Sequence, residues 1–411
     1  MSPETAAAYS LLSAEAVRSR AQRMLALGLD DKLSNFRIDL ERLDAAADLV
    51  IAAMRKAYPT LAVPFHSRWR HFSVAGQDRY AAVEDKTQWR DRAAKARSAF
   101  DLAIVSVLLD AGAGTQWRYR DTVTGQPIGR SEGLALASLD MFARGDFSSD
   151  PSDPLRADAA ALGAMTPEKL SKGFQVTPAN PLVGPEGRAA LLRALGKQAA
   201  ANPAVFARND HARPGGLFDH LAALAEDGAI PAPRILSEVL HGLGPIWPSR
   251  LTLGGVPLGD CWRHPLMTTP DATSGLVPLH KLSQWLSYSL IEPLEQAGIA
   301  VTNLDGLTGL AEYRNGGLFV DAGVLRLRDA TEAARAHDVG APLVVEWRAL
   351  TVALLDRIAL TIRAKLNMNA ASLPLAKILQ GGTWAAGRAV ALERRADGSP
   401  PIKVISDGTV F

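Results

Sequence analysis

The chain has 411 residues, a length that fits one large domain or two to four of ordinary size. Its 45 basic and 43 acidic residues give a net charge of +2, which argues against a surface that coats a polyanion. A single cysteine, Cys261, excludes an internal disulfide bond, and no apolar run approaches the roughly 18 residues of a membrane span. We expect a cytoplasmic protein that binds neither a nucleic acid nor a membrane.

Most segments repeat their apolar residues at the spacing of an amphipathic helix. Ser13 is placed to be the N-cap of a helix that runs to Leu29. A second helix, 42–57, should end before Tyr58-Pro59, because the residue before proline avoids helical geometry. Further helices are predicted at 91–111, 132–144, 186–200, 216–227, 232–243, 279–297, 345–366 and 375–394.

Strand patterns are few and occur only at 62–74, 116–122 and 402–411. The sequence therefore predicts a mainly α, compact multi-helix fold with a few short strands. We expect a single large domain over residues 1–411, or two subdomains, 1–150 and 151–411, within it.

The run Gly129-Arg130-Ser131-Glu132-Gly133 matches the G-x-S-x-G pattern of a nucleophile elbow, in which a turn exposes the serine above a buried strand. The residues before it, 124–128, have the composition of a turn and not of a buried strand. Ser131 is therefore interpreted as the N-cap of the helix that begins at Glu132.

The segment 65–72, FHSRWRHF, alternates in the manner of a strand, which would place His66, Arg68 and Arg70 on one face. We interpret it as a solvated edge strand, with an anion-binding lip as the alternative. The sequence has no P-loop, G-x-G-x-x-G, H-E-x-x-H or C-x-x-C motif, so nucleotide-driven and zinc-protease chemistry lack their usual support.

Asp260, Cys261 and His264, with His280 nearby, are residue types that could bind zinc or iron. One C-x-x-H pair without a second pair is weak evidence for such a site, and His264 could equally be a hydrogen-bonded loop residue. We predict no metal and no other cofactor. A metal-dependent hydrolase of a ureido or amide compound that uses these residues is the alternative.

Polar residues mark one face of the helix predicted at 279–297. Lys281, Gln284 and Tyr288 lie on one stripe of this helix, where they could meet one ligand. A loop then leads to Glu312-Tyr313-Arg314. The simpler interpretations are a surface lysine that covers apolar neighbours, and a surface ion pair between Glu312 and Arg314.

The helix predicted around 344–350 is apolar on most sides yet carries Glu346 and Arg348. Two residues separated by one position point in nearly opposite directions on a helix, so at least one of these charges should enter the interior. A buried charge needs a partner or a ligand.

Long sequence blocks spread over nearly the whole chain resemble a bacterial and fungal uracil-catabolism family. That family acts in a pathway that degrades uracil through a ribosylated urea. The blocks are FHSRWRHF (65–72), GRSEGLALASLDMF (129–142), GPIWPSRL (244–251), GDCWRHP (259–265), HKLSQWLSYSL (280–290), GLTGLAEYRNGGLFVD (306–321), VVEWRALTVALLDR (344–357) and LAKILQGGTWAAGR (375–388).

More distantly, the chain is similar to the queuosine salvage glycosylases, whose helical fold resembles that of DNA glycosylases. Their phosphate-binding lysine and a nearby glutamine match Lys281 and Gln284 in order and spacing. Their Asp-Tyr-Arg motif matches Glu312-Tyr313-Arg314, and a charged pair in an apolar helix matches 346–348. The catalytic aspartate of those enzymes thus corresponds to a glutamate here, one methylene longer.

This resemblance implies an N-ribosyl hydrolase that releases urea or a ureido compound from ribose or ribose 5-phosphate. A carboxylate stabilises the positive charge that builds on the sugar, which makes Glu312 the expected catalytic residue. Lys281 is expected to bind a 5′-phosphate. The other expected substrate-binding residues are Arg314, Glu346, Arg348, Asp260, Trp262 and His264. The expected partner is a small ribosyl substrate; a non-catalytic ligand-binding protein of the same pathway is a further alternative, and the oligomeric state stays open.

Overall fold

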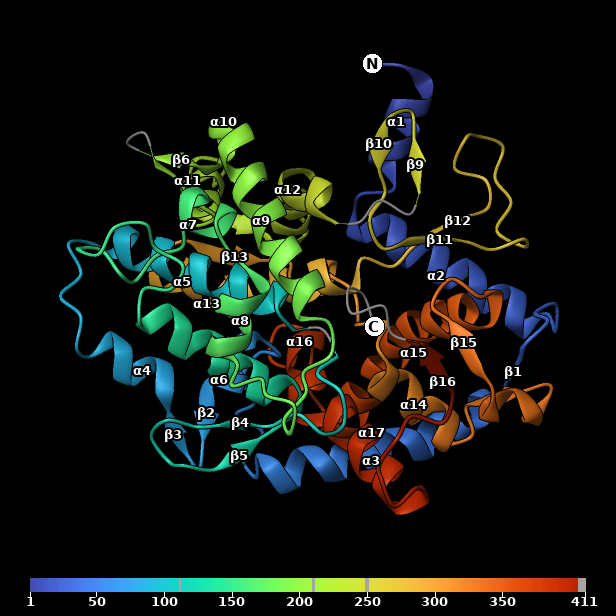
Figure 1. Ribbon diagram of the computed structural model, residues 1–411. Helices are drawn as coiled ribbons and strands as arrows, with labels where there is room; N and C mark the ends of the chain where they lie inside the picture. Colours follow the sequence, from blue (N-terminus) through green and yellow to red (C-terminus); the bar gives the residue numbers. More distant parts are fainter. Residues whose placement is uncertain (111, 209–210, 248–250, 406–411) are drawn as a thin grey trace.

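Helices form most of the computed structural model, which describes residues 1–110, 112–208, 211–247 and 251–405 (Figure 1). The first half of the chain contains α1 (Pro3–Ser10), α2 (Ala14–Leu29), α3 (Leu43–Ala57), α4 (Arg79–Glu84), α5 (Arg92–Leu108), α6 (Arg130–Ala143), α7 (Ala159–Gly163), α8 (Pro167–Gly173) and α9 (Pro185–Ala201). The second half contains α10 (Pro203–Phe206), α11 (Gly216–Ala223), α12 (Ala232–Leu243), α13 (Lys281–Gln296), α14 (Tyr313–Asp321), α15 (Pro342–Leu366), α16 (Leu375–Ile378) and α17 (Trp384–Arg394). The predicted mainly α fold is confirmed.

Short helical turns connect several of these helices. Five are 3₁₀ turns within the described residues: η1 (Leu40–Arg42), η2 (Arg68–Phe72), η3 (Gly244–Ile246), η4 (Leu304–Gly306) and η5 (Ala330–Ala334). The turn η6 (Leu379–Thr383) is π-helical and interrupts the helix that the sequence predicted over 375–394. Such π turns occur often at functional sites.

The strands of the described chain occur only in pairs, and none of the pairs extends into a larger sheet. The antiparallel pairs are β1 (Phe36–Ile38) with β14 (Leu325–Leu327), β2 (Ser73–Val74) with β3 (Gln77–Asp78), β4 (Tyr119–Arg120) with β5 (Pro127–Ile128), β6 (Ala207–Arg208) with β7 (His211–Ala212), β9 (Thr252–Leu253) with β10 (Val256–Pro257), and β11 (Cys261–Arg263) with β12 (Leu276–Pro278). The parallel pairs are β8 (Ala229–Pro231) with β13 (Ala300–Thr302), and β15 (Ala336–Asp338) with β16 (Lys403–Ile405).

Two helix boundaries follow the local signals in the sequence. The Ser13 hydroxyl accepts a hydrogen bond from the Ala16 N–H, which satisfies one of the free donors at the start of α2. α3 ends at Ala57, directly before Tyr58-Pro59, as predicted. Local chemistry therefore determines where these helices begin and end.

The strand predicted at 62–74 is wrong for most of its length. Residues 68–72 form the 3₁₀ turn η2, and only Ser73–Val74 pair as a strand. The turn lets Arg68 reach inward, where its guanidinium donates to the Ser106 hydroxyl at 2.7 Å and pairs with Asp110 at 3.2 Å. An alternating edge strand would have left this charge in solvent. Of the other predicted strands, 116–122 shrinks to β4, and 402–411 is a strand at β16, its last six residues lying outside the described chain.

The N-cap assigned to Ser131 is also wrong, because α6 begins at Arg130 with Gly129 as its N-cap. The Ser131 hydroxyl donates instead to Asp110 Oδ2 at 2.8 Å. The preceding strand β5 belongs to a two-stranded ribbon and not to a buried sheet, so the surroundings of a nucleophile elbow are absent at this described position.

The long helix α15 is buried on most sides and packs against α2, α3 and α14 (Figure 1). α13 packs against α5 and α12, and α14 packs against α17. One hydrophobic cluster contains buried side chains from Leu12 to Ile402, so chain segments far apart in sequence share a core.

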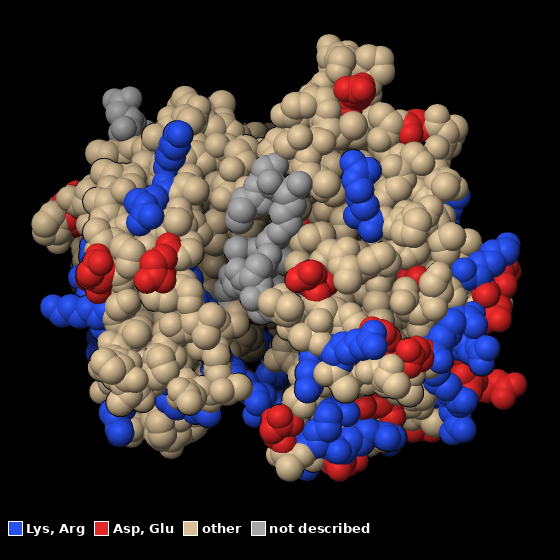
Figure 2. All heavy atoms as spheres, turned by 45° about the vertical axis from the view of Figure 1, so that its right-hand side comes forward, with Lys and Arg blue, Asp and Glu red and all other residues tan. Residues whose placement is uncertain are grey.

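Charged side chains of both signs are intermixed on the face of the molecule drawn in Figure 2, as expected for a net charge of +2. Within the described residues, no helix combines the length and the apolar character that crossing a membrane requires.

Candidate active site

A cavity of about 570 Å³ lies where the N-termini of four helices converge, those of α6, α13, α14 and α17. The C-terminal end of α5 lies beside it. Helix N-termini carry partial positive charge from their free N–H groups. Three residues predicted from the sequence, Lys281, Glu312 and Arg314, line this one cavity.

Glu312 is the N-cap of α14, and its carboxylate is held by the helix that it begins. Oε2 accepts the Arg314 N–H at 2.9 Å, and Oε1 accepts the Asn315 N–H at 2.6 Å. The residue is only 7% exposed. Each oxygen keeps a further lone pair after these bonds, so a fixed carboxylate is presented to the cavity.

Lys281 is the first residue of α13, and its side chain lies among carboxylates of the cavity. Burial lowers the pKa of its ammonium group, and the charges of Glu312 and Asp110 oppose that shift. The ammonium and the Glu312 carboxylate therefore interact within one cavity. The simpler interpretation of a surface ion pair between Glu312 and Arg314 is wrong, since both residues are buried. Lys281 is half-buried and lines the cavity.

Arg314 packs against two aromatic side chains, Tyr313 and Trp384. Its guanidinium carbon lies 4.1 Å from the centre of the Trp384 ring, and Nε donates to the Tyr313 hydroxyl at 3.3 Å. Gly387 allows α17 to approach this closely, because a Cβ there would collide with the Arg314 carbonyl oxygen. The buried Nη1 of Arg314 has no hydrogen-bond partner among the residues that the structure describes, so it is available to a ligand that accepts.

Asp260 and Arg348 form a buried bidentate ion pair behind the cavity wall. Both guanidinium–carboxylate distances are 2.8 Å, and the Trp262 indole N–H donates to Asp260 Oδ1 at 2.6 Å. Burial by itself raises the pKa of Asp260, but Arg348 outweighs it and lowers that pKa to about 2. Asp260 Oδ2 accepts the Lys281 backbone N–H at 2.9 Å, and Arg348 Nε donates to the Ala311 carbonyl at 3.1 Å.

The ion pair thus ties the start of α13 to the residue before Glu312. Asp260, Trp262 and Arg348 are not among the residues that line the cavity. The structure therefore places these three residues behind Lys281 and Glu312, where Asp260 and Arg348 hold the backbone at Lys281 and at Ala311.

Glu346 lies deeper in the protein and is fully buried. Its carboxylate accepts hydrogen bonds from the backbone N–H and the side-chain amide of Asn35, at 3.1 and 3.0 Å, and contacts His264 Nε2 at 3.1 Å. The prediction that at least one charge of this helix enters the interior is confirmed, because both Glu346 and Arg348 do so. Neither Glu346 nor His264 lines the cavity.

Gln284 and Tyr288 are also turned away from the cavity and hold the loop that leads to Glu312. The Gln284 amide exchanges two hydrogen bonds with Thr308, and the Tyr288 hydroxyl donates to the Thr308 carbonyl at 2.9 Å. Of the polar stripe on this helix, Lys281 alone reaches the cavity.

Two histidines, His66 and His71, line the cavity. The interpretation of 65–72 as a solvated edge strand had not predicted this position. His66 Nδ1 lies 2.8 Å from Gln380 Oε1 in the π turn η6, and His71 Nδ1 lies 3.3 Å from Arg68 Nη1. Burial lowers the pKa of His66 to about 4 and that of His71 to about 3. Both imidazoles are therefore neutral at physiological pH. The signal in the sequence that could have found these two histidines is the block 65–72, FHSRWRHF, which contains both.

These two imidazoles give stability a pH dependence of defined sign. The unfolded chain, with histidine pKa values near 6.5, binds more protons than the folded chain, so stability falls as pH drops from about 6.5 through 4. We expect His66→Gln to lose about 2 kcal/mol less than the wild type between pH 7 and pH 5. Urea denaturation at the two pH values measures this. The exposed His211, changed to Gln, is the control; equal losses in wild type and His66→Gln would contradict the assignment.

Asp110, just after α5, is a second carboxylate in the cavity. Burial disfavours its charge, but Arg68 and Lys281 outweigh that effect and lower its pKa. Nothing in the sequence distinguishes Asp110 from an ordinary loop aspartate, and its partner Arg68 lies 42 positions earlier. Only the fold brings them together.

The alternative metal ligands are not gathered at one point. Burial raises the pKa of the Cys261 thiol to about 12, and His280 Nε2 contacts the Leu11 carbonyl at 2.9 Å. His264 contacts Glu346 and Asp260 pairs with Arg348. In the part of the chain that the structure describes, no three His, Cys, Asp or Glu side chains are arranged to hold a metal ion.

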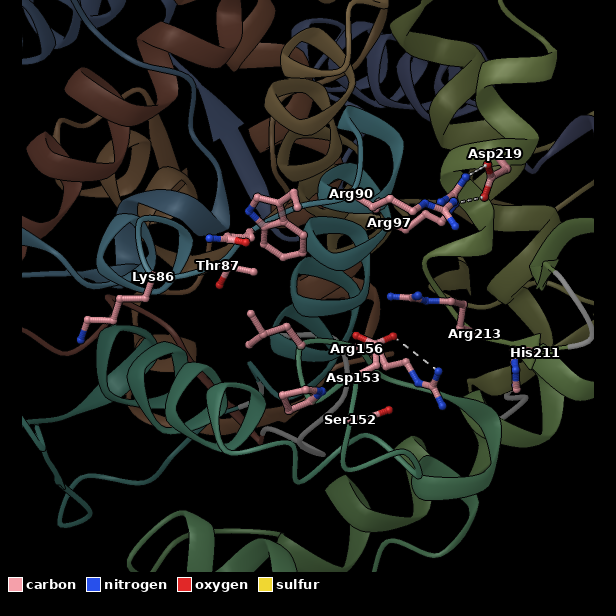
Figure 3. Close-up of a pocket in the computed structure, with 15 residues that line it drawn as sticks. Lys86, Thr87, Arg90, Arg97, Ser152, Asp153, Arg156, His211, Arg213 and Asp219 are labelled. Carbon is pink, nitrogen blue, oxygen red and sulfur yellow. Dashed lines mark hydrogen bonds and ion pairs between the residues drawn. The ribbon is translucent and has the colours of Figure 1, made fainter.

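A larger cavity of about 830 Å³ lies at the other end of α5 (Figure 3). Its basic side chains are largely paired with aspartates: Arg97 donates to Asp219 at 2.7 and 2.9 Å, and Arg156 contacts Asp153 at 3.5 Å. Arg213 pairs with Asp101. Because these charges are compensated within the protein, we consider the smaller cavity, with its fixed carboxylate and lysine, the better candidate.

Comparison with known proteins gives the family of the chain. A family model described as "Protein of unknown function (DUF1688)" matches residues 10–411. The chain is 40% identical over 421 residues to "Protein urg3" of Schizosaccharomyces pombe, with 100% of both chains covered. It is 37% identical over 419 residues to "Uracil catabolism protein 4" of Lachancea kluyveri, with 93% of each chain covered. The chain therefore belongs to the DUF1688 family, and its predicted membership of a uracil-catabolism family is confirmed.

Proposed function

We propose that the protein is an N-ribosyl hydrolase of uracil catabolism, which cleaves the N-glycosidic bond of ribosylurea or its 5′-phosphate and releases urea. The pathway rests on the relatives, one of which is named for uracil catabolism. The reaction rests on the cavity and on the similarity to queuosine salvage glycosylases. A ureido compound in place of urea is the variant of this proposal that keeps the same bond cleavage.

One observation carries the proposal: a buried carboxylate, Glu312, and a lysine, Lys281, interact within a cavity large enough for a ribosyl ligand. Breaking a C–N glycosidic bond builds positive charge on the sugar ring. A fixed carboxylate in a partly dry site stabilises that charge more strongly than water does. A carboxylate in solvent, far from Lys281, would have offered no such site.

The reaction balances with water as the only co-substrate. The bond between the anomeric carbon and nitrogen breaks, and the electron pair stays with the nitrogen. Glu312 orients the attacking water, whose oxygen bonds to the anomeric carbon, and a proton from the water ends on the departing nitrogen. Glu312 ends the reaction with the negative charge with which it began, and the products are urea and ribose or ribose 5-phosphate.

Lys281 is assigned the 5′-phosphate, with Arg314 Nη1 as a second donor. We expect Lys281→Met to raise KM for ribosylurea 5′-phosphate by about 30-fold and KM for ribosylurea by less than about threefold. Steady-state kinetics with both substrates measures this, and Lys281→Arg, which keeps the charge, should recover part of the loss. Equal effects on the two substrates would instead assign Lys281 to the sugar or to Glu312.

The proposal is tested by incubating the purified protein with ribosylurea and with its 5′-phosphate and assaying urea and reducing sugar. We expect both products in equal amounts from at least one of the two compounds. Release of ammonia from an intact glycosidic bond would favour an amide hydrolase in its place.

A further inference from the structure

Besides Arg314 Nη1, two buried polar atoms of residues that line the cavity have no hydrogen-bond partner among the described residues, and they are of opposite kind. Asp110 Oδ1 is an acceptor that forms an ion pair with Arg68 Nη1 at 3.2 Å and keeps a further lone pair for a ligand. Trp285 Nε1 is a donor. The Asp110 side chain is 6% exposed and Trp285 is 3% exposed. Buried polar groups are almost always paired, so a ligand with one donor and one acceptor would complete this part of the site.

Asp110 is fixed as an anion. The Ser131 hydroxyl donates to Oδ2 at 2.8 Å, which sets the orientation of the carboxylate, with Oδ1 turned to the Arg68 guanidinium. The charges of Arg68 and Lys281 overcome the effect of burial and lower the pKa of Asp110. Asp110 therefore accepts hydrogen bonds and does not supply a proton.

Trp285 lies one helical turn after Lys281 on α13, so both side chains point to the same side of that helix. Arg68 lies over its ring, with the guanidinium carbon 5.5 Å from the ring centre, and the His71 ring centre is also 5.5 Å away. These neighbours hold the indole in place next to the Asp110–Arg68 pair. Donor and acceptor thus belong to one packed cluster.

We propose that Asp110 and Trp285 form the leaving-group subsite of this cavity and select a ureido or amide group. The carboxylate accepts an N–H of the terminal amino group, and the indole N–H donates to the carbonyl oxygen. This inference rests on the proposed function, because it assigns the group that departs from the ribose. It adds the chemical feature that distinguishes the substrate from ribosides of other bases.

The subsite also explains how the bond would break without an acid beside the nitrogen. As the glycosidic bond lengthens, negative charge spreads from the departing nitrogen to the ureido oxygen. The indole N–H stabilises the charge at that oxygen. The nitrogen then takes the proton that the attacking water has released, so charge and atoms balance.

Ribose hydroxyls are donors too, so the test separates the sugar from the ureido group. We use Glu312→Gln protein, in which bound ligand is not turned over, and measure affinity by calorimetry. The ligands are ribosylurea, its terminal N,N-dimethyl form, which lacks the terminal N–H, and 2-deoxyribosylurea. We expect the dimethyl form to bind about 100-fold more weakly than ribosylurea, and the deoxy form within about threefold of it.

Adding Asp110→Asn should reduce the 100-fold preference to less than about fivefold. Asp101→Asn is the matched control, since Asp101 is buried on α5, the helix that Asp110 follows, and pairs with Arg213 outside this cavity; it should keep the preference. Trp285→Phe removes the indole donor without removing a charge, so it tests the subsite independently of Asp110. It should weaken ribosylurea binding about tenfold and leave ribose 5-phosphate binding unchanged.

Equal binding of ribosylurea and its dimethyl form would overturn the subsite, as would a preference that survives Asp110→Asn. Selective loss of the 2-deoxy compound would assign Asp110 to the sugar and overturn it as well. Hydrolysis of ribosylurea by the wild type is measured separately. Hydrolysis without ureido preference removes the subsite alone, whereas ureido-selective binding without hydrolysis removes the proposed reaction.

Discussion

Glu312→Gln should lower the rate of urea release by about 1,000-fold or more while the protein stays folded. Glutamine keeps the size of the side chain and can still accept one of the two backbone N–H groups at the start of α14. It loses the negative charge that stabilises the sugar cation. Initial rates of urea release measure the effect, and circular dichroism with thermal unfolding shows whether the fold is kept.

Two variants sharpen this prediction. Glu312→Asp keeps the charge on a shorter side chain, so it should retain more activity than Glu312→Gln. Asp321→Asn is the matched control, because Asp321 is a buried carboxylate at the other end of α14 and pairs with Arg395. It should leave turnover within about threefold of the wild type. Activity of Glu312→Gln within tenfold of the wild type would remove Glu312 from the reaction.

Arg348→Met should produce the largest loss of stability, about 3–5 kcal/mol in the free energy of unfolding, because it leaves the buried Asp260 without its partner. Activity should fall as well. The Ala311 carbonyl loses its hydrogen bond, and Asp260, which holds the Lys281 backbone, loses its anchor. Urea denaturation measures the stability, and assays below the transition measure the activity of the folded fraction.

The double variant Asp260→Leu/Arg348→Met distinguishes positioning from stability alone. It removes both charges, so we expect it to regain a large part of the lost stability. Activity should stay low, since neither Lys281 nor the residue before Glu312 has recovered its anchor. Full activity in the double variant would show that the ion pair does not position the site.

The helices could be predicted from sequence because their signals are local. Ser13 caps α2 with its own side chain, and Pro59 stops α3 through its neighbour. The strand prediction for 65–72 was wrong for the opposite reason. Its alternation is real in the sequence, but the turn that forms there depends on Arg68 reaching Asp110, a contact that no local pattern contains.

The residues of the candidate site also fall into two groups, those that local signals in the sequence reveal and those that only the fold brings together. Lys281 and Glu312 could be found because each begins a helix and matches a known motif in order and spacing. The apolar sequence around Glu346 predicted a buried charge, but the partners of the Glu346 carboxylate, Asn35 and His264, come from distant segments. Asp110 could not be found, since its importance depends entirely on which side chains surround it.

The cleavage products of ribosylurea 5′-phosphate test the central claim most directly. In water enriched in ¹⁸O, we expect the wild type to release one urea per ribose 5-phosphate, with the heavy oxygen on the anomeric carbon of the sugar and none in urea. Heavy oxygen in a product of the ureido carbonyl, with the ribose–nitrogen bond intact, would show attack on the carbonyl and contradict the account.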